Sequence, residues 1–216
     1  MKIAITNPTT WPWVRRGAER FINELAAYLA AQGHDVTVIS AKPGVGETYV
    51  DRGYKTICHR RLWHPWMAKI GLLEFHMFFF TAFYSLLRGR YDAVVSLTFM
   101  DAFAAILTRR FTKAPSLFLV NGLPPKVQYF RSLTLKGAVF GAAVRRADAV
   151  IAISHYVAAY LHRRWGASST RIPIPLDVDS FVSPQIWQKQ EDLIVCAAAL
   201  DDHRKGGAAL DRKSVV

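Results

Sequence analysis

Apolar and polar residues follow two different rhythms along the chain. Short apolar runs recur, and each is ended by a polar residue, a glycine or a proline, which is typical of strands buried on both faces. The longer stretches between them repeat an apolar residue every three or four positions, which predicts amphipathic helices. The predicted strands are residues 2–6, 35–40, 54–60, 92–97, 116–120, 148–154 and 170–175. The predicted helices are residues 18–29, 68–87, 102–111, a segment within 133–146, and 155–165.

Residues at the ends of the predicted helices agree with this division. Gly33 stands where a C-terminal cap glycine belongs, and Gly166 ends the last helix in the same way. Ser154 precedes that helix and is a suitable N-cap. Because buried strands alternate with amphipathic helices, we expect an α/β fold with a doubly wound, parallel, Rossmann-like sheet over residues 1–180.

The pattern changes after this domain. Residues 181–192 are polar, contain Pro184 and read as a linker. Residues 193–210 begin with a fresh buried strand and a charged turn, so they predict the start of a second α/β domain. Residues 211–216 continue no helix and match what a common sequencing-adapter sequence encodes. We expect this tail to be non-native and the second domain to be truncated; a genuine short C-terminus is the alternative.

Composition places the chain among globular proteins and adds an unusual charge. Hydrophobic residues make up 51% and charged residues 20%, while the formal net charge is +12. Such an excess suits an anionic partner, whether a nucleic acid, an acidic membrane surface or a phosphorylated small molecule. The two cysteines, Cys58 and Cys196, form no zinc motif or disulfide framework, which favours a reducing compartment. The first apolar run is ended by Asn7 and Pro8, so we expect no signal peptide and a cytoplasmic protein.

Ligands of doubly wound sheets bind beyond the carboxyl ends of the strands, so the loops there are the candidate sites. The first such loop ends with Arg16 and Gly17 as a helix begins, an arrangement that suits a phosphate group. A plain tight turn would have the same residues. The sequence lacks the glycine fingerprint of nicotinamide cofactors and the P-loop motif, so neither type of site is expected.

Five segments then follow one another in a characteristic order. They read RRGAERFINELAAYLAAQGHDVTVIS, YDAVVSL, SLFLVNGLP, RADAVIAISHYVAAYL and STRIPIPLDVDSF, and LIVCAAALDDHRKGG comes after them. This series resembles the N-terminal domain of the retaining glycosyltransferases of family four, followed by the first strand and turn of their C-terminal domain. The resemblance implies the GT-B fold, covers residues 1–210 and makes the chain the N-terminal half of such an enzyme.

The resemblance implies a function and a set of site residues. It implies transfer of a hexosyl-type sugar, with retention, from a nucleotide-sugar donor to a glycan or lipid-linked acceptor, as in cell-envelope polysaccharide biosynthesis. Arg16 and Gly17 would approach the donor phosphates, and Arg204 and Lys205 would neutralise the diphosphate leaving group. No metal ion and no cofactor is expected. The family's acidic donor-binding motif lies beyond Leu210, so we expect the chain alone to be inactive.

The sequence departs from the family pattern at two site positions. Arg16 stands where the first glycine of the family's loop is usual. Asn121 occupies the catalytic position at which the family commonly has histidine, and asparagine can bond a hydroxyl group but does not titrate near neutral pH. His155 follows a predicted strand end and would line the cleft, although a helix-capping context explains it as well.

Two segments raise the question of a membrane. Residues 70–87 are strongly apolar, and a buried helix is favoured over partial insertion in a membrane surface or a membrane span. Residues 60–69 mix cations with tryptophans, as interfacial anchors and packed surface loops both do. Peripheral contact with the inner face of a membrane would use the excess charge, and no nucleic-acid partner is expected. A non-catalytic basic α/β module that binds membrane or nucleic acid stays the alternative, as does a GT-B epimerase or phosphorylase.

Overall fold

The structure is a computed structural model that describes residues 1–62, 67, 73–123 and 135–174. These residues belong to one compact unit, Met1–Pro175. The predicted linker, the start of the second domain and the predicted non-native tail all lie outside the described residues. The boundaries assigned to them from the sequence therefore stay predictions.

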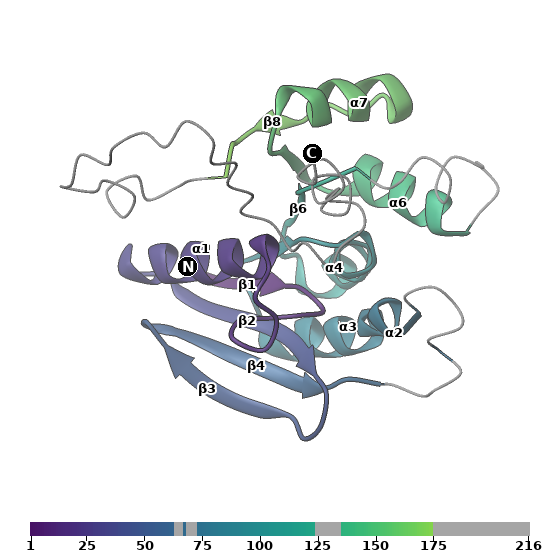
Figure 1. The fold of residues 1–216 in the computed structure, drawn as a ribbon. Helices are drawn as coiled ribbons and strands as arrows, with labels where there is room; N and C mark the ends of the chain where they lie inside the picture. The colour runs from purple at the N-terminus through teal and green to yellow at the C-terminus, as the bar shows by residue number, and fades with distance from the viewer. Residues whose placement is uncertain (63–66, 68–72, 124–134, 175–216) are drawn as a thin grey trace, which may run out of the picture. The chain divides into compact units, whose positions relative to one another are not determined.

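The described strands form one sheet in the order β3-β4-β2-β1-β5-β6-β7-β8 (Figure 1). The strands are β1 Lys2–Thr6, β2 Asp35–Lys42, β3 Glu47–Asp51, β4 Tyr54–Arg60, β5 Ala93–Ser96, β6 Ser116–Val120, β7 Ala149–Ala152 and β8 Thr170–Arg171. All neighbours in the sheet are parallel except β3 and β4, which are antiparallel. The α/β fold with a parallel sheet, predicted from the sequence, is thereby confirmed, and the antiparallel strand β3 is added to it at one edge.

Helices cover both faces of this sheet (Figure 1). They are α1 Gly17–Ala31, α2 Leu73–His76, α3 Phe78–Gly89, α4 Phe99–Thr112, α6 Leu135–Arg146 and α7 His155–Trp165. The alternation of side chains along β1 divides the core: Ile3 and Ile5 pack with Ile22 of α1, whereas Ala4 packs with Leu86 of α3 on the other face. Each fully buried aliphatic side chain contributes about 1.5–3 kcal/mol to this core.

The end of α1 shows how a predicted cap works. Gly33 has φ +83°, a left-handed conformation that favours glycine. Its N–H donates to the carbonyl of Ala30 (2.9 Å), and the N–H of His34 donates to the carbonyl of Leu29 (3.2 Å). This pair of bonds is a Schellman motif, which satisfies two carbonyl groups at the helix end and turns the chain into β2.

The structure differs from the sequence-based assignment at several places, and three of them concern β3, the segment of α2 and α3, and β8. Strand β3 was not predicted, because it lies at the exposed edge of the sheet and lacks a buried apolar run. The single helix predicted over residues 68–87 is interrupted at Met77, which separates α2 from α3. The last predicted strand, 170–175, shortens to Thr170–Arg171.

A glycine next to β3 is required by close packing rather than by its backbone angles. A Cβ atom added at Gly46 would stand 2.9 Å from the carbonyl oxygen of Cys58 and 3.2 Å from the amide nitrogen of Arg60, both on the backbone of β4 or beside it. We therefore expect Gly46→Ala to lower the free energy of unfolding by about 1–3 kcal/mol, as overpacking does. Urea unfolding of Gly46→Ala and of Gly17→Ala, whose added Cβ meets nothing within 4 Å, measures the difference. Equal stability of the two variants would contradict the prediction.

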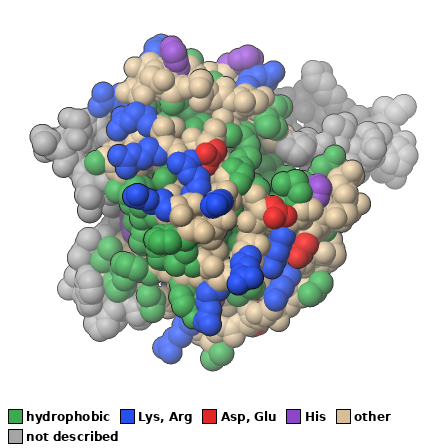
Figure 2. Space-filling model, turned by 180° about the vertical axis from the view of Figure 1, so that it is seen from behind, with side chains coloured by type: hydrophobic (Ala, Val, Ile, Leu, Met, Phe, Trp, Pro, Cys, Tyr) green, Lys and Arg blue, Asp and Glu red, His purple; other side chains and the backbone are tan. Residues whose placement is uncertain are grey.

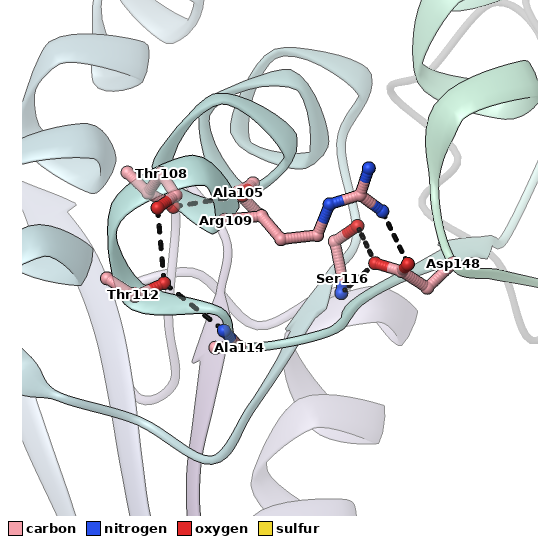
Figure 3. A network of polar contacts seen from close by, with 7 residues as sticks. All are labelled: Ala105, Thr108, Arg109, Thr112, Ala114, Ser116 and Asp148. Carbon is pink, nitrogen blue, oxygen red and sulfur yellow. Dashed lines mark hydrogen bonds and ion pairs between the residues drawn. The ribbon is translucent and has the colours of Figure 1, made fainter.

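The amino ends of β6 and β7 are joined by a polar network (Figure 3). Asp148, just before β7, accepts hydrogen bonds from the N–H (2.8 Å) and the hydroxyl group (3.0 Å) of Ser116. Arg109 in the last turn of α4 forms an ion pair with the same carboxylate, and its hydrogen bond holds the pKa of Asp148 below the usual value. The network fixes the sheet edge opposite the strand ends at which ligands bind.

Candidate active site

The sheet order places a topological switch point between β1 and β5, and the space outside the carboxyl ends of these two strands is called the crevice below. From β1 the chain passes through α1 to β2 on one side, and from β5 it passes through α4 to β6 on the other side. Ligands of doubly wound folds bind at such a switch point, outside the carboxyl ends of the strands. The starts of α1 and α4 therefore lie at the edge of the sheet where a ligand is expected.

Arg16 lines a cavity of about 250 Å³ at this edge. The residues lining it are Pro8, Arg16, Phe75, His76, Thr98, Phe99 and Met100. Gly17 follows Arg16 as the first residue of α1 and is exposed, with open space where a Cβ would stand. The first helical bond runs from the N–H of Arg20 to the carbonyl of Arg16 (3.0 Å), so the N–H groups of residues 17–19 have no partner within the helix. A phosphate group can approach this helix start closely.

Asn121 lines a second cavity, of about 290 Å³, at the carboxyl end of β6. The residues lining it are Leu97, Thr98, Phe99, Phe118, Val120, Asn121, Gly122, Leu123 and Phe140. Thr98 and Phe99, at the start of α4, line both cavities. The fold thus brings Arg16 and Asn121, which are far apart in the sequence, to adjacent hollows on either side of one segment.

The other predicted site residues are placed differently. His155 is the first residue of α7 and is exposed, and it lines neither of the two cavities. Its neighbour Ser154 caps the helix as predicted, accepting a hydrogen bond from the N–H of Val157 (3.2 Å). Arg204 and Lys205 lie outside the described residues. Their roles stay predictions.

The loop between β1 and α1 is held by a buried polar chain. The side-chain amide of Asn7 donates to the carbonyl oxygen (2.6 Å) and to the hydroxyl oxygen (3.2 Å) of Thr9. The Thr9 hydroxyl group donates in turn to Oε1 of Glu19 (2.5 Å), in the first turn of α1. Among the described residues nothing bonds the second carboxylate oxygen of Glu19, Oε2, which is buried. These bonds fix the loop that leads to Arg16.

Two further cations lie at the carboxyl ends of strands and were not singled out in the sequence. Arg61, just after β4, donates to the carbonyl oxygens of Ala41 (3.3 Å) and Pro8 (3.4 Å). Lys42, the last residue of β2, forms an ion pair with Glu47 (2.7 Å) and lies 4.2 Å from the ring centroid of Trp13. With Arg16 they place positive charge along the edge that would face an anionic ligand.

A buried carboxyl group lies beneath the crevice. Asp101, in the first turn of α4, is fully buried. Its Oδ2 accepts a hydrogen bond from the hydroxyl group of Thr6 (2.9 Å), whose oxygen lies 2.8 Å from the hydroxyl oxygen of Ser96. The hydroxyl group of Thr98 donates to the other carboxylate oxygen. Burial raises the pKa of Asp101 to about 7, although these hydrogen bonds oppose the shift.

Sequence reasoning missed this carboxyl group, although a signal was present. Thr98 and Asp101 have the spacing of a capping box, in which the residue at the third helical position turns back to the N-cap. The motif stands directly before the apolar stretch that predicted the helix at residues 102–111. Reading it would have moved the helix start to residue 99, where the structure has it.

A cavity larger than these two lies at the opposite edge of the sheet. It measures about 560 Å³, runs along the start of β7 and the end of α7, and includes Arg145, Asp148 and Ser168. Asp148 is already bound by Arg109 and Ser116 in the network of Figure 3. The crevice at the switch point, with two helix starts and three cations, is the better candidate despite its smaller hollows.

The chain matches a family model. The model described as Glycosyltransferase Family 4 covers residues 15–180, which include Arg16, Gly17 and Asn121. No curated protein matches the chain.

Solved structures have the same fold at low sequence identity. Sucrose-phosphate synthase from Thermosynechococcus elongatus has a TM-score of 0.56 at 19% identity, over 80% of this chain and 47% of that one. HepE from Anabaena, in complex with UDP and glucose, has a TM-score of 0.56 at 15% identity, over 85% of this chain and 47% of HepE. UGT89C1 from Arabidopsis thaliana, complexed with UDP, has a TM-score of 0.53 at 12% identity, over 82% of this chain and 50% of UGT89C1. The chain thus spans about half the length of these structures.

Proposed function

The chain belongs to glycosyltransferase family 4, and from that premise we propose that it is the N-terminal half of an enzyme that transfers a sugar from a nucleotide-sugar donor. The observation that carries the proposal is the open backbone at Gly17 beside Arg16, at the start of α1 and at the switch point of the sheet. Structures with this fold hold UDP, as in Anabaena HepE and Arabidopsis UGT89C1. We further propose a hexosyl donor, retention at the anomeric carbon, and a glycan or lipid-linked acceptor.

Each candidate residue has a role in this reaction. Breaking a glycosyl phosphate bond leaves negative charge on the diphosphate, and preorganised cations and N–H groups lower the barrier. In the proposal Arg16 and the N–H groups that begin at Gly17 bind the phosphates, and Arg204 and Lys205 neutralise the leaving group from the other domain. Asn121 bonds a hydroxyl group of the reacting sugar. The reaction then depends on no metal ion or cofactor, because the cations of the chain supply the neutralising charge.

The Gly17→Ala variant tests the proposal. An added methyl group at Gly17 meets nothing in the free protein, so we expect unfolding to be unchanged or slightly harder. The same methyl group would occupy the space through which a phosphate reaches the helix start, so binding of UDP-glucose is expected to weaken at least about tenfold, a loss of about 1.4 kcal/mol. Isothermal titration or NMR titration of the full chain with UDP-glucose measures the change.

Two controls accompany this titration. Tyr28→Ala, an exposed position on the same helix far from its start, is expected to bind UDP-glucose like the native chain. Binding of glucose alone, which lacks the phosphates, should differ little between the native chain and Gly17→Ala. Equal UDP-glucose binding by Gly17→Ala and the native chain would sink the proposal.

A second part of the proposal concerns a membrane surface. Lys and Arg side chains are spread over the face shown in Figure 2, with hydrophobic side chains between them and few acidic ones. Exposed aromatic residues occur on the helices of one face of the sheet: Phe80 (57% exposed) and Tyr84 on α3, and Phe111 on α4. Among the described residues, none of the helices combines the length and apolar character needed to cross a bilayer. We propose peripheral contact with an anionic membrane, at its cytoplasmic face.

Vesicle binding measures this contact. Phe80→Ser is expected to reduce binding to vesicles that contain anionic lipid several-fold, because an exposed aromatic ring inserts among the headgroups. Tyr28→Ser, which removes an aromatic ring exposed on α1 at the other face, should leave binding unchanged. Stronger retention on a single-stranded oligonucleotide than on the vesicles, with a steep dependence on salt, would instead favour a nucleic-acid-binding module.

A further inference from the structure

We propose that Asp101 is a positioning residue of the crevice, which fixes Thr98 and Phe99 between the two cavities through its bonds to Thr98 and Thr6. The proposal rests on the proposed function, because it concerns the shape of the donor and acceptor site. Asp101 itself touches no ligand: it is fully buried and acts through the segment that lines both cavities.

The position of Asp101 explains why it controls this segment. It stands at the third position of α4, one turn into the helix, while Thr98 is the N-cap residue with extended backbone angles. The Thr98 hydroxyl group is turned to Asp101 and makes no side-chain bond to the N–H groups of the helix start. Thr6 anchors the carboxyl group from β1, so the start of α4 is attached to the neighbouring strand across the switch point.

The number of available protons decides which group donates in each hydrogen bond of this network. An ionised carboxylate only accepts, so Thr6 must donate its single proton to Asp101, and Ser96 must then donate to Thr6. Once Asp101 is protonated, its own O–H group can donate to the Thr6 oxygen. The Thr6 proton is then no longer needed in that bond, and Thr6 can donate it to Ser96. The bond from Thr98 also loses its ionised acceptor and weakens. The protonation of Asp101 therefore decides how firmly the start of α4 is held.

Both forms of Asp101 are populated near neutral pH, because burial raises its pKa to about 7. The groups that face it are the hydroxyl groups of Thr6 and Thr98 and nearby backbone groups, all of which favour the ionised form. Among the described residues, the charged or titratable side chains that line the cavity beside Thr98 are Arg16 and His76. His76 contacts Phe99 (ring centroids 5.4 Å apart) and is itself an imidazole, so any experiment must separate its effect on this segment from that of Asp101.

Amide NMR of the full chain across neutral pH tests the proposal without a ligand. In the native chain the resonances of Thr98 and Phe99 are expected to shift with a midpoint of about 7. In Asp101→Asn, which keeps the shape and removes the titrating group, they should stay flat over the same range. In His76→Phe the midpoint should persist, because Asp101 is unchanged. Phenylalanine keeps a ring beside Phe99, so the packing there is retained. Loss of the midpoint in His76→Phe and its survival in Asp101→Asn would overturn the proposal.

A second pair of variants keeps the test decisive if Asp101→Asn fails to fold. Thr98→Ala removes one donor to the ionised carboxylate, so it should raise the midpoint measured at Phe99, while Thr98→Ser should restore it. An unchanged midpoint in Thr98→Ala would contradict the positioning role.

Binding of UDP-glucose separates this inference from the proposed function. In the native chain its affinity is expected to change several-fold through the same midpoint, and this dependence should disappear in Asp101→Asn. Absence of UDP-glucose binding at every pH would contradict the phosphate-binding roles proposed for Arg16 and Gly17, but it would not affect the pH response measured at Thr98. Binding that does not change with pH would overturn the positioning role alone.

Discussion

Replacing Asp101 by asparagine is expected to remove a pH-dependent loss of stability of about 4 kcal/mol. Burial raises the pKa of this carboxyl group from 3.8 to about 7 in the folded chain. The folded state therefore holds the proton more tightly than the unfolded state does. The stability that Asp101 contributes is fully present below its unfolded pKa and is lost as the pH rises through the folded value. Asparagine cannot ionise, so its contribution does not change with pH.

Urea unfolding of both chains from about pH 4 to about pH 8 measures this difference. The free energy of unfolding of Asp101→Asn should rise relative to the native chain across this range. Its value at acid pH includes a constant offset from the altered hydrogen bonds, so only the change with pH is predicted. Asp148→Asn is the matched control of opposite sign, because Arg109 lowers the pKa of Asp148. That carboxyl group contributes stability above its unfolded pKa, which is lost as the pH falls. Parallel curves for Asp101→Asn and the native chain would refute the prediction.

Phe140→Ala is expected to cost about 3–5 kcal/mol, the range for truncating a buried phenylalanine. Phe140 is 4% exposed, and its ring centroid lies 4.9 Å from that of Trp165, 5.7 Å from that of Phe118 and 6.0 Å from that of Phe99. The residue therefore joins α6 to β6, to α7 and to the start of α4. Its removal leaves a cavity that several elements would have to move to fill.

Phe111→Ala provides the comparison. This ring is 74% exposed on α4, so its loss should change the free energy of unfolding by less than about 0.5 kcal/mol. Both variants can be followed by urea unfolding at one pH. Phe140 also lines the cavity of Asn121, so its truncation should enlarge that hollow and disturb Phe99 as well. Similar losses in the two variants would show that the ring cluster around Phe140 is not the packed core described above.

The sequence predicted those elements whose burial produces a distinct run or period of apolar residues. Strand β6 was predicted with its observed bounds, because Pro115 and Asn121 bracket one buried run. In the hairpin of β3 and β4, strand β4 was predicted with its observed bounds, whereas β3 and the turn show no such run. The turn depends on left-handed angles at Arg52 (φ +44°) and Gly53 (φ +81°), and arginine is an unusual residue for such an angle. The interruption at Met77 depends on packing that periodicity does not encode.

The site was predictable in part for a similar reason. Parallel strands all end at one edge, so the residues that follow β1 and β6 had to meet there, and Arg16 and Asn121 do line adjacent cavities. The pairing of Asp101 with Thr6 was not predictable, since it depends on which face of β1 the helix α4 covers. Arg61 was missed because it donates to the backbone carbonyl groups of Ala41 and Pro8. Such bonds between distant residues produce no recognisable spacing in the sequence.

Mapping the binding site of UDP-glucose on the full chain by amide NMR shows whether the start of α1 binds the donor phosphates. We expect saturable shifts at Gly17 and Ala18, where the helix start meets the phosphates, together with smaller shifts at Thr98 and Asn121. UDP should reproduce the shifts at Gly17 and Ala18. Shifts confined to other surfaces, such as the exposed face of α3, or no saturable shift at the start of α1, would contradict this expectation.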